Sequence, residues 1–416
     1  MAGITTFLVM AYILAIVPNV VSSTGMDKGA LFTTTVLASV TATLFMSLYA
    51  KLPFALGPGI GLMAFFTYTV CLSMGYSWQY ALTAVFIEGI VFILLTLTNL
   101  REKLLYALPL CLRNSIGSGI GLFVAFLGLE NSGLVIDSEA TLVTLGNVTS
   151  GSGLLCLIGL VITSILLARK VNGALLYGII LTTLIGIPMG QTQLNGVFSL
   201  PPSISPIAFH LDWENIFTKD MVLIVFTFLF VDLFDTIGTL VGVSSNMEEA
   251  KPKDTQPPTD HKIPWIKKAF FADAVGTTVG ALLGSTTITT FVESTAGVGA
   301  GGRTGLTSFI TAVCFLVSLF LAPFFLSIPA AATAPALILV GLMMMGSIKR
   351  IPFDDYTESI PAYLCILMIP LTYNIANGIA IGVISYVLIN VLSGSYRKVT
   401  AGNYILAAIL VVKYLL

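Results

Sequence analysis

The stretch Ser285-Thr-Thr-Ile-Thr-Thr-Phe-Val-Glu-Ser-Thr-Ala-Gly-Val-Gly-Ala-Gly-Gly302 decides the fold. It lies within an apolar region, yet its composition does not suit one continuous helix. The threonines near its start favour extended backbone, and the glycines near its end weaken a helix. We therefore expect a short strand that gives way to a helix near Glu293.

A matching break occurs in the first half of the chain, at Pro53-Phe-Ala-Leu-Gly-Pro-Gly-Ile-Gly-Leu62. Glycine and proline at this density also interrupt a helix. Extended backbone at membrane depth must be buried in protein or line a cavity. Broken segments at corresponding positions of two halves therefore point to a binding site near the membrane midplane.

The rest of the chain is built for lipid, with 56% hydrophobic and 9% charged residues among 416. A span needs about 20 apolar residues. Apolar runs cover 3–22, 31–50, 57–73, 79–99, 114–130, 152–168, 172–190, 220–243, 268–284, 286–302, 305–326, 331–347, 360–374 and 376–393. We predict an all-α polytopic membrane protein of about 14 segments, arranged as 7+7 inverted repeats, in which segments 3 and 10 are broken.

The distribution of basic residues predicts the orientation, because cytoplasmic loops are rich in Lys and Arg. With the N-terminus in the cytoplasm, nearly all of the 19 basic residues fall at cytoplasmic turns, and Lys28, Lys219 and Lys413 are the exceptions. The 131–150 loop, on the outer side, carries no Lys or Arg. We expect a multi-pass protein of the cytoplasmic (inner) membrane, with residues 404–416 as a short terminal helix.

Four carboxylates, Glu88, Asp232, Asp235 and Glu293, lie inside apolar runs. A charge at mid-bilayer costs roughly 2.5–3.5 kcal/mol, so it persists only where a polar cavity and a partner receive it. Asp232 and Asp235 share one helical face with Thr239. Two acids and a hydroxyl can hold a proton and accept hydrogen bonds from a ligand N–H. The alternatives are a polar contact between helices and, for Asp232, a supporting role.

Glu293 precedes a helix whose first N–H groups lack intrahelical partners. A ligand there meets a carboxylate acceptor beside backbone donors, a pattern that suits the edge of a purine or pyrimidine. Alternatively, Glu293 caps this helix and pairs with Arg303. Glu88 is expected to support the site by stabilising the irregular third segment.

Other classes of function find no support in the sequence. The five cysteines are scattered and form no CxxC pair or Cys/His cluster, so we expect no metal and no disulfide framework. We find no nucleophile–base constellation of an enzyme, no cofactor motif, and no basic stripe for nucleic acid.

The chain resembles the AzgA-like purine permeases, a branch related to the uracil and nucleobase–ascorbate transporters. The similarity covers nearly the whole chain. It is carried by Ile4-Thr-Thr-Phe-Leu-Val-Met-Ala-Tyr-Ile13, Thr24-Gly-Met-Asp-Lys-Gly29, Pro53 to Tyr68, Asp232 to Thr239, Glu293 to Thr307 and Met368 to Tyr386.

This resemblance implies proton-coupled import of purine nucleobases by alternating access. A core domain (1–100 and 220–327) would move against a gate domain (101–219 and 328–416). The resemblance also implies a short strand in each of the broken segments 3 and 10, which meet at the substrate, and a homodimer. Substrate is expected at Glu293, Asp235, Met63, Thr290 and Ser294, coupling protons at Asp235, Asp232 and Glu293, and support from Thr239, Glu88, Gly59, Gly61 and Gly297.

One position departs from the family pattern, which usually reads Gly-Leu-Asn-Ala in the third segment. Here Met63 stands in place of an asparagine implicated in purine recognition. A thioether lacks the donors and the acceptor of an amide, which predicts a shifted substrate preference. The alternative is that Met63 only fills space between helices.

Two questions stay open at this stage. A carrier of the same architecture with a different substrate, a pyrimidine or a small anion, is the alternative function. An anion carrier should present positive groups at its site, and several acids argue against it. Buried acids fit proton coupling, but the sequence leaves sodium open.

Overall fold

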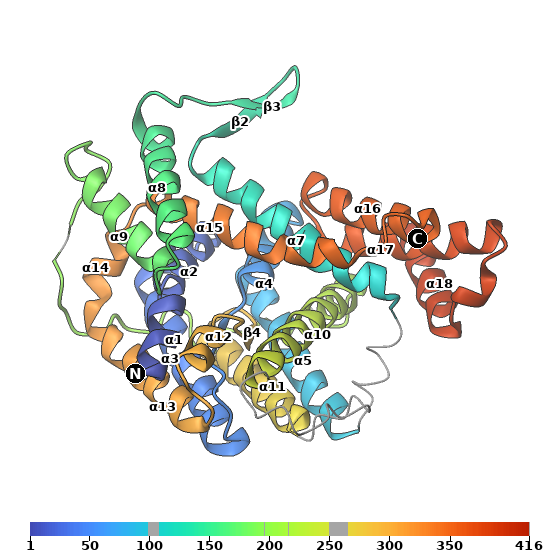
Figure 1. Ribbon diagram of the computed structural model, residues 1–416, viewed down its shortest axis with the longest axis horizontal. Helices are drawn as coiled ribbons and strands as arrows, with labels where there is room; N and C mark the ends of the chain where they lie inside the picture. Colours follow the sequence, from blue (N-terminus) through green and yellow to red (C-terminus); the bar gives the residue numbers. More distant parts are fainter. Residues whose placement is uncertain (99–107, 195, 215, 249–264, 416) are drawn as a thin grey trace. The chain divides into compact units, whose positions relative to one another are not determined.

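Helices make up most of the computed structural model, which describes all residues except 99–107, 195, 215, 249–264 and 416 (Figure 1). Those of the first half are α1 (Ala2–Met10), α2 (Ile13–Val21), α3 (Lys28–Phe45), α4 (Ile60–Ala64), α5 (Trp78–Leu97), α7 (Leu110–Asn131), α8 (Gly151–Ala168) and α9 (Ala174–Gly186). Those of the second half are α10 (Lys219–Glu248), α11 (Ile266–Leu283), α12 (Ser294–Gly299), α13 (Gly305–Ser318), α14 (Ala322–Leu326), α15 (Ala330–Met344), α16 (Tyr356–Leu371), α17 (Ile375–Leu392) and α18 (Ala401–Leu415).

Several of these helices are long and apolar enough to cross a membrane. In the described part of the chain, 8 stretches meet this condition by length and composition: Ala2–Thr24, Lys28–Ala50, Trp78–Leu97, Leu110–Asn131, Gly151–Ala168, Gly305–Leu326, Ala330–Arg350 and Ile375–Leu392. Three shorter apolar helices cover Ile60–Ser73, Ala174–Gly186 and Tyr356–Leu371. The prediction of a mostly helical, multi-pass membrane protein is confirmed.

Two predicted connections look different in the structure. Helix α10 continues to Glu248, beyond the predicted end at residue 243, because neither glycine nor proline interrupts the chain between Gly242 and Pro252. The predicted polar turn at 245–267 otherwise falls mainly outside the described residues. The 131–150 loop contains an antiparallel hairpin of β2 (Val135–Ser138) and β3 (Leu142–Leu145).

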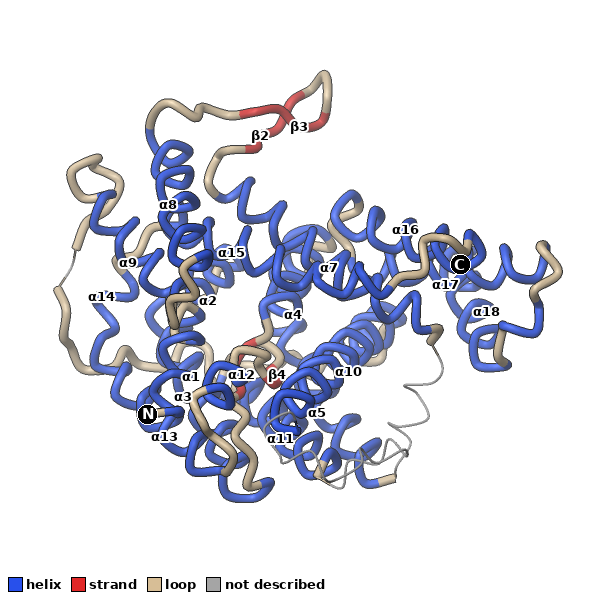
Figure 2. Tube along the Cα trace, viewed as in Figure 1, coloured by secondary structure: helices blue, strands red, loops and turns tan. Residues whose placement is uncertain are grey.

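The two glycine-containing breaks meet as a pair of short strands (Figure 2). Strand β1 (Leu56–Pro58) runs antiparallel to β4 (Ile288–Thr290), with Leu56 opposite Thr290 and Pro58 opposite Ile288. Every residue of both strands is buried. The prediction of a short strand in each broken segment is therefore confirmed.

Small residues let the helices approach these strands closely. A Cβ on Gly276 of α11 would lie 2.6 Å from the Cβ of Ala42 on α3, and one on Gly280 would lie 2.8 Å from Ile288 of β4. Small residues at such crossings allow close backbone packing, which is a main source of association between helices in lipid. The strand pair is thus enclosed by α3 and α11.

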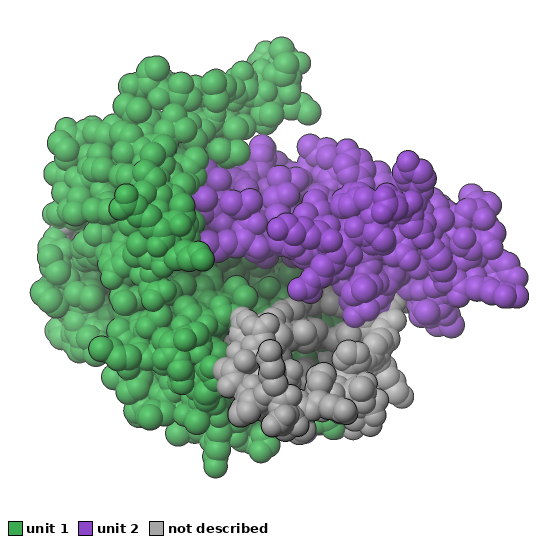
Figure 3. All heavy atoms as spheres, in the orientation of Figure 1, with its two compact units in different colours: residues 1–96, 128–337 green, residues 97–127, 338–416 purple. Residues whose placement is uncertain are grey.

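The chain divides into two compact units (Figure 3). Unit 1 comprises residues 1–96 and 128–337, and unit 2 comprises residues 97–127 and 338–416. Both strands of the central pair and all four predicted acids belong to unit 1. The division into core and gate domains concerns movement during transport, and it stays a prediction.

Candidate functional site

The paired strands β1 and β4 form the framework of the candidate site. Backbone hydrogen bonds continue past the strands at both ends: Phe291 N donates to Ala55 O at 3.0 Å, and Gly59 N donates to Thr287 O at 3.1 Å. The short helices α4 and α12 begin directly beyond these ends. The two broken segments therefore form one continuous backbone-paired unit, to which both halves of the chain contribute.

Side-chain hydroxyls satisfy backbone groups of β1 and of the residue before it that the strand pairing leaves open. Thr43 of α3 accepts from Leu56 N at 3.0 Å and donates to Leu56 O at 3.1 Å. Ser294 Oγ accepts from Ala55 N at 3.0 Å. Because buried backbone groups need partners, these hydroxyls allow an irregular segment at membrane depth.

The predicted supporting glycines lie where the backbone has little space. A Cβ on Gly59 would lie 2.6 Å from Thr289 Cγ2, and a Cβ on Gly297 would lie 2.0 Å from Thr6 Oγ1. Gly61 is buried in the first turn of α4. At Gly59 and Gly297, a larger residue would displace an element of the site.

Glu293 lies at the N-terminal end of α12, immediately beyond β4, and is partly exposed. Its Oε1 accepts a hydrogen bond of 2.7 Å from the hydroxyl of Tyr12, which precedes α2. No side-chain capping bond to α12 forms, and Arg303 donates instead to the carbonyls of Val298 and Gly302. The Tyr12 hydroxyl therefore orients the carboxylate. The alternative, in which Glu293 caps α12 and pairs with Arg303, is not what the structure shows.

Asp232 and Asp235 lie on α10, but their surroundings differ. Asp232 is fully buried and accepts from Thr236 at 3.1 Å. Asp235 is partly exposed, and its charge interacts with those of Asp232 and Glu293. Thr239, one turn further on, is 6% exposed. Of the two aspartates, Asp235 is the one that a ligand can reach.

A further buried acid, Asp273 on α11, was not among the predicted site residues. Its Oδ2 accepts from Thr236 at 3.1 Å, and its Oδ1 accepts from Thr290 at 3.2 Å. Asp273 also lies inside an apolar run, 268–284. A carboxylate within an apolar run is the feature by which Glu88 was predicted, and it would have identified Asp273 as well. Its position shortly after Lys267 and Lys268 made it resemble the charged end of a span.

Glu88 also reaches the strand pair, through the second break. Thr287 donates to Glu88 Oε2 at 2.8 Å, and both side chains are fully buried. This bond links α5 to the residue that precedes β4. Support of the third segment by Glu88 stays a prediction.

Three other predicted substrate contacts are enclosed in this structure. Met63 is 1% exposed within α4, Thr290 is 1% exposed, and Ser294 is fully buried. The hydroxyls of Thr290 and Ser294 are engaged with Asp273 and with the backbone of Ala55. Glu293 and Asp235 are therefore the polar side chains that a ligand can contact directly.

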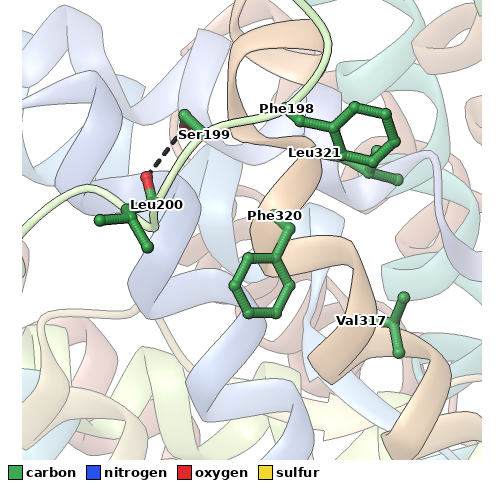
Figure 4. Close-up of a pocket in the computed structure, with 6 residues that line it drawn as sticks. All are labelled: Phe198, Ser199, Leu200, Val317, Phe320 and Leu321. Carbon is green, nitrogen blue, oxygen red and sulfur yellow. Dashed lines mark hydrogen bonds between the residues drawn. The ribbon is translucent and has the colours of Figure 1, made fainter.

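A groove elsewhere on unit 1 has a different character (Figure 4). It is lined by Phe198, Ser199, Leu200, Val317, Phe320 and Leu321. The Ser199 hydroxyl donates to the carbonyl of Leu200 at 2.9 Å. This lining has no charged side chain and offers few hydrogen-bonding groups to a polar ligand. The acids around β4 therefore remain the candidate site.

Comparison with known proteins identifies the family. A model described as a permease family, Xan_ur_permease, matches residues 1–381. The adenine permease AdeP of Escherichia coli (strain K12) is 38% identical over 412 residues, covering 99% of this chain and 91% of AdeP. The guanine/hypoxanthine permease PbuG of Bacillus subtilis (strain 168) is 40% identical over 411 residues, covering 95% of this chain and 91% of PbuG.

The fold also matches a solved structure, the transmembrane domain of the cyanobacterial bicarbonate transporter BicA. The TM-score is 0.67, and the match covers 92% of this chain and 96% of that domain. At 18% identity this likeness concerns the fold alone. Because the family match spans most of the chain and both relatives align over 91% of their own length, the chain belongs to the Xan_ur_permease family of membrane transporters and is not an enzyme.

Proposed function

We propose that this protein imports purine nucleobases together with protons across the cytoplasmic membrane. The observation that carries the proposal is the pair of partly exposed acids, Glu293 and Asp235, at the end of the buried strand β4. The named substrates of AdeP and PbuG, adenine, guanine and hypoxanthine, are all purines.

Each acid has its own role in this proposal. The Glu293 carboxylate, fixed by Tyr12, accepts hydrogen bonds from the N–H groups on one purine edge. Asp235, which lies close enough to Glu293 for their charges to interact, takes up and releases the coupling proton. Protonation of Asp235 changes the electrostatic potential at Glu293, and purine binding at Glu293 changes the potential at Asp235. Purine binding and proton binding are thereby linked.

Alternating access completes the proposal. The core domain (1–100 and 220–327) would carry both breaks and the acids, and the gate domain (101–219 and 328–416) would provide the surface against which it moves. The 14 segments would form two inverted repeats of seven, with a cytoplasmic N-terminus and a homodimeric assembly. Rigid-body movement around a fixed midplane site is the general behaviour of transporters built from such repeats.

Uptake measurements test the proposal directly. Cells that lack their own nucleobase carriers would express the protein and receive labelled hypoxanthine, guanine, adenine, uracil or bicarbonate, with and without a protonophore. We expect concentrative uptake of at least one purine that the protonophore abolishes. Uptake of uracil or bicarbonate alone would assign the alternative substrate, and dependence on sodium rather than protons would replace the coupling ion.

A further inference from the structure

Thr236 of α10 lies at the centre of a buried polar cluster that joins three elements. Its hydroxyl is 3.1 Å from Asp232 Oδ1, 3.1 Å from Asp273 Oδ2 and 3.0 Å from Thr289 Oγ1. These contacts connect α10, α11 and β4. All four side chains are at most 1% exposed, so the cluster lies away from solvent.

Counting hydrogens around this hydroxyl favours a bound proton. A threonine hydroxyl has one hydrogen to donate and two lone pairs to accept with. Two ionised carboxylates would have to share the single hydrogen of Thr236. The hydroxyl of Thr289 also has a single hydrogen, and Asp235 is a second partner for it. A proton on one of the two carboxyl groups gives each carboxylate contact a hydrogen of its own.

Electrostatics leads to the same state. Two ionised carboxylates that share a buried site repel each other, and one of them then keeps its proton. The acidic groups around this pair would add to the repulsion: Asp235 on α10, Glu293 beyond β4, and Glu88, which reaches the same segment through Thr287. The face of α11 toward α3 is apolar, with Gly276 and Gly280 against Ala42 and Ala38.

We propose that Asp232 and Asp273 hold one proton between them across the hydroxyl of Thr236, and that Asp273 is thereby a positioning residue for β4. Asp273 also accepts from Thr290, and Thr289 joins the same cluster, so two of the three residues of β4 are tied to the shared proton. Glu293 follows Thr290 by three residues. Loss of the proton would remove a hydrogen bond from this cluster and alter the support of the strand that precedes Glu293.

The shared proton is independent of the substrate, whereas its role in transport rests on the proposed function. Infrared spectroscopy of purified protein in lipid nanodiscs, with carbon-13 on the aspartate carboxyl groups, detects a protonated aspartic acid by its carbonyl stretch. We expect this band at neutral pH in the wild type, and we expect it to persist in Asp235→Asn.

Asp235 can itself carry a proton in the proposed function, so the test is made in the Asp235→Asn background, where adding Asp273→Asn should remove the band. The asparagine amide can donate to Thr236 and accept from Thr290, so Asp232 becomes the single, ionised acceptor. Thr236→Val should shift or remove the band because it deletes the bridge. Thr227→Val is the matched control, since the Thr227 hydroxyl bonds only to Leu223 O within α10, at 2.8 Å; its spectrum should equal that of the wild type.

The transport readout is the pH profile of purine uptake. Asp273→Asn should flatten this profile while purine affinity at neutral pH changes by less than about threefold, and Asp273→Leu should abolish uptake. A purely structural residue would lower uptake equally at every pH. An absent band in Asp235→Asn, or an unchanged band when Asp273→Asn is added to it, would overturn the shared proton. A band that behaves as expected in a protein that takes up no purine would instead refute the proposed function.

Discussion

The hydroxyl of Tyr12 donates a hydrogen bond of 2.7 Å to Oε1 of Glu293, across 281 residues of sequence. Tyr12 is 1% exposed and lies where the chain passes from α1 to α2. A carboxylate offers about four acceptor sites, so the bond from Tyr12 leaves acceptor capacity for a ligand. The pair therefore joins the first segment of the chain to the acid that we assign to purine recognition.

Tyr12→Phe should weaken purine affinity while the fold is kept. The substitution removes one hydroxyl and leaves the ring, so the carboxylate of Glu293 loses its fixed orientation. A hydrogen bond to a charged group contributes roughly 1.5–3 kcal/mol, or about tenfold to a hundredfold in Kd. Calorimetric titration of the purified protein measures this. Tyr80→Phe, which loses a hydroxyl bonded to Thr218 instead, should bind purine normally.

Glu293→Gln should preserve folding and greatly weaken purine uptake. The amide has the same shape as the carboxylate, but it replaces one acceptor with a donor. The expected loss in affinity is about 1.5–3 kcal/mol. Competition assays in cells give the apparent affinity, and a near-normal value would remove Glu293 from the recognition of substrate.

Asp235→Asn should abolish proton-driven accumulation and affect binding less, because a permanently neutral group cannot titrate. Uptake against a purine gradient, together with the accompanying acidification of the cell, tests the coupling. Asp220→Asn is the control on the same helix, since Asp220 lies in the first turn of α10 and bonds to Tyr76. Should Asp235→Asn still concentrate purine and acidify the cell, Asp232 becomes the next candidate.

Met63→Asn should change the ranking among hypoxanthine, guanine and adenine if residue 63 helps to read the purine edge. We expect this change because a site that hydrogen-bonds a ligand group discriminates strongly against analogues that lack it. Met63 is 1% exposed here, so the alternative is a packing role. In that case asparagine lowers the melting temperature and leaves the inhibitor order unchanged.

The Asp355–Lys398 pair in unit 2 predicts a loss of stability in acid. The Lys398 ammonium, 2.6 Å from Asp355 Oδ2, and the hydrogen bonds from Thr357 lower the pKa of Asp355 to about 2. An aspartate in an unfolded chain has a pKa of about 3.9. The stabilisation is therefore complete above about pH 4 and is lost as the pH falls through about 2.

Melting temperatures in detergent across this range measure the effect. Asp355→Asn should lower the melting temperature at neutral pH slightly, as expected for an exposed pair, and should reduce its fall below about pH 4. Asp354→Asn, at the neighbouring carboxylate, is the control. An identical acid profile for the wild type and Asp355→Asn would contradict the assignment.

The sequence predicted the helical membrane architecture and both broken segments because each rests on local chemistry. The threonines before Phe291 favour extended backbone, and the glycines around Pro58 interrupt a helix. The acids within apolar runs were also visible, because lipid makes each of them costly. The helical segments, the breaks and the acids within apolar runs can all be predicted without knowing which segments pack against each other.

The partners of these acids could not be predicted in the same way. Tyr12 appears in the sequence as one aromatic residue of an apolar run, and its bond to Glu293 depends on the packing of the first segment against the tenth. The same is true of Glu88 and Thr287, which are 199 residues apart. The different exposures of Asp232 and Asp235 likewise depend on neighbouring helices rather than on their spacing along α10.

The pairing of β1 with β4 has a consequence for biosynthesis. Ala55 N reaches its acceptor on Ser294, 239 residues later in the chain. At about 5–20 residues per second, a ribosome needs on the order of 10–50 s to make that interval. During this time the first break enters the membrane without its partner strand, and its polar backbone groups need temporary partners because lipid offers none. A ribosome stalled before residue 288 would therefore leave an inserted but incomplete protein, which membrane quality control should recognise at Leu56–Pro58.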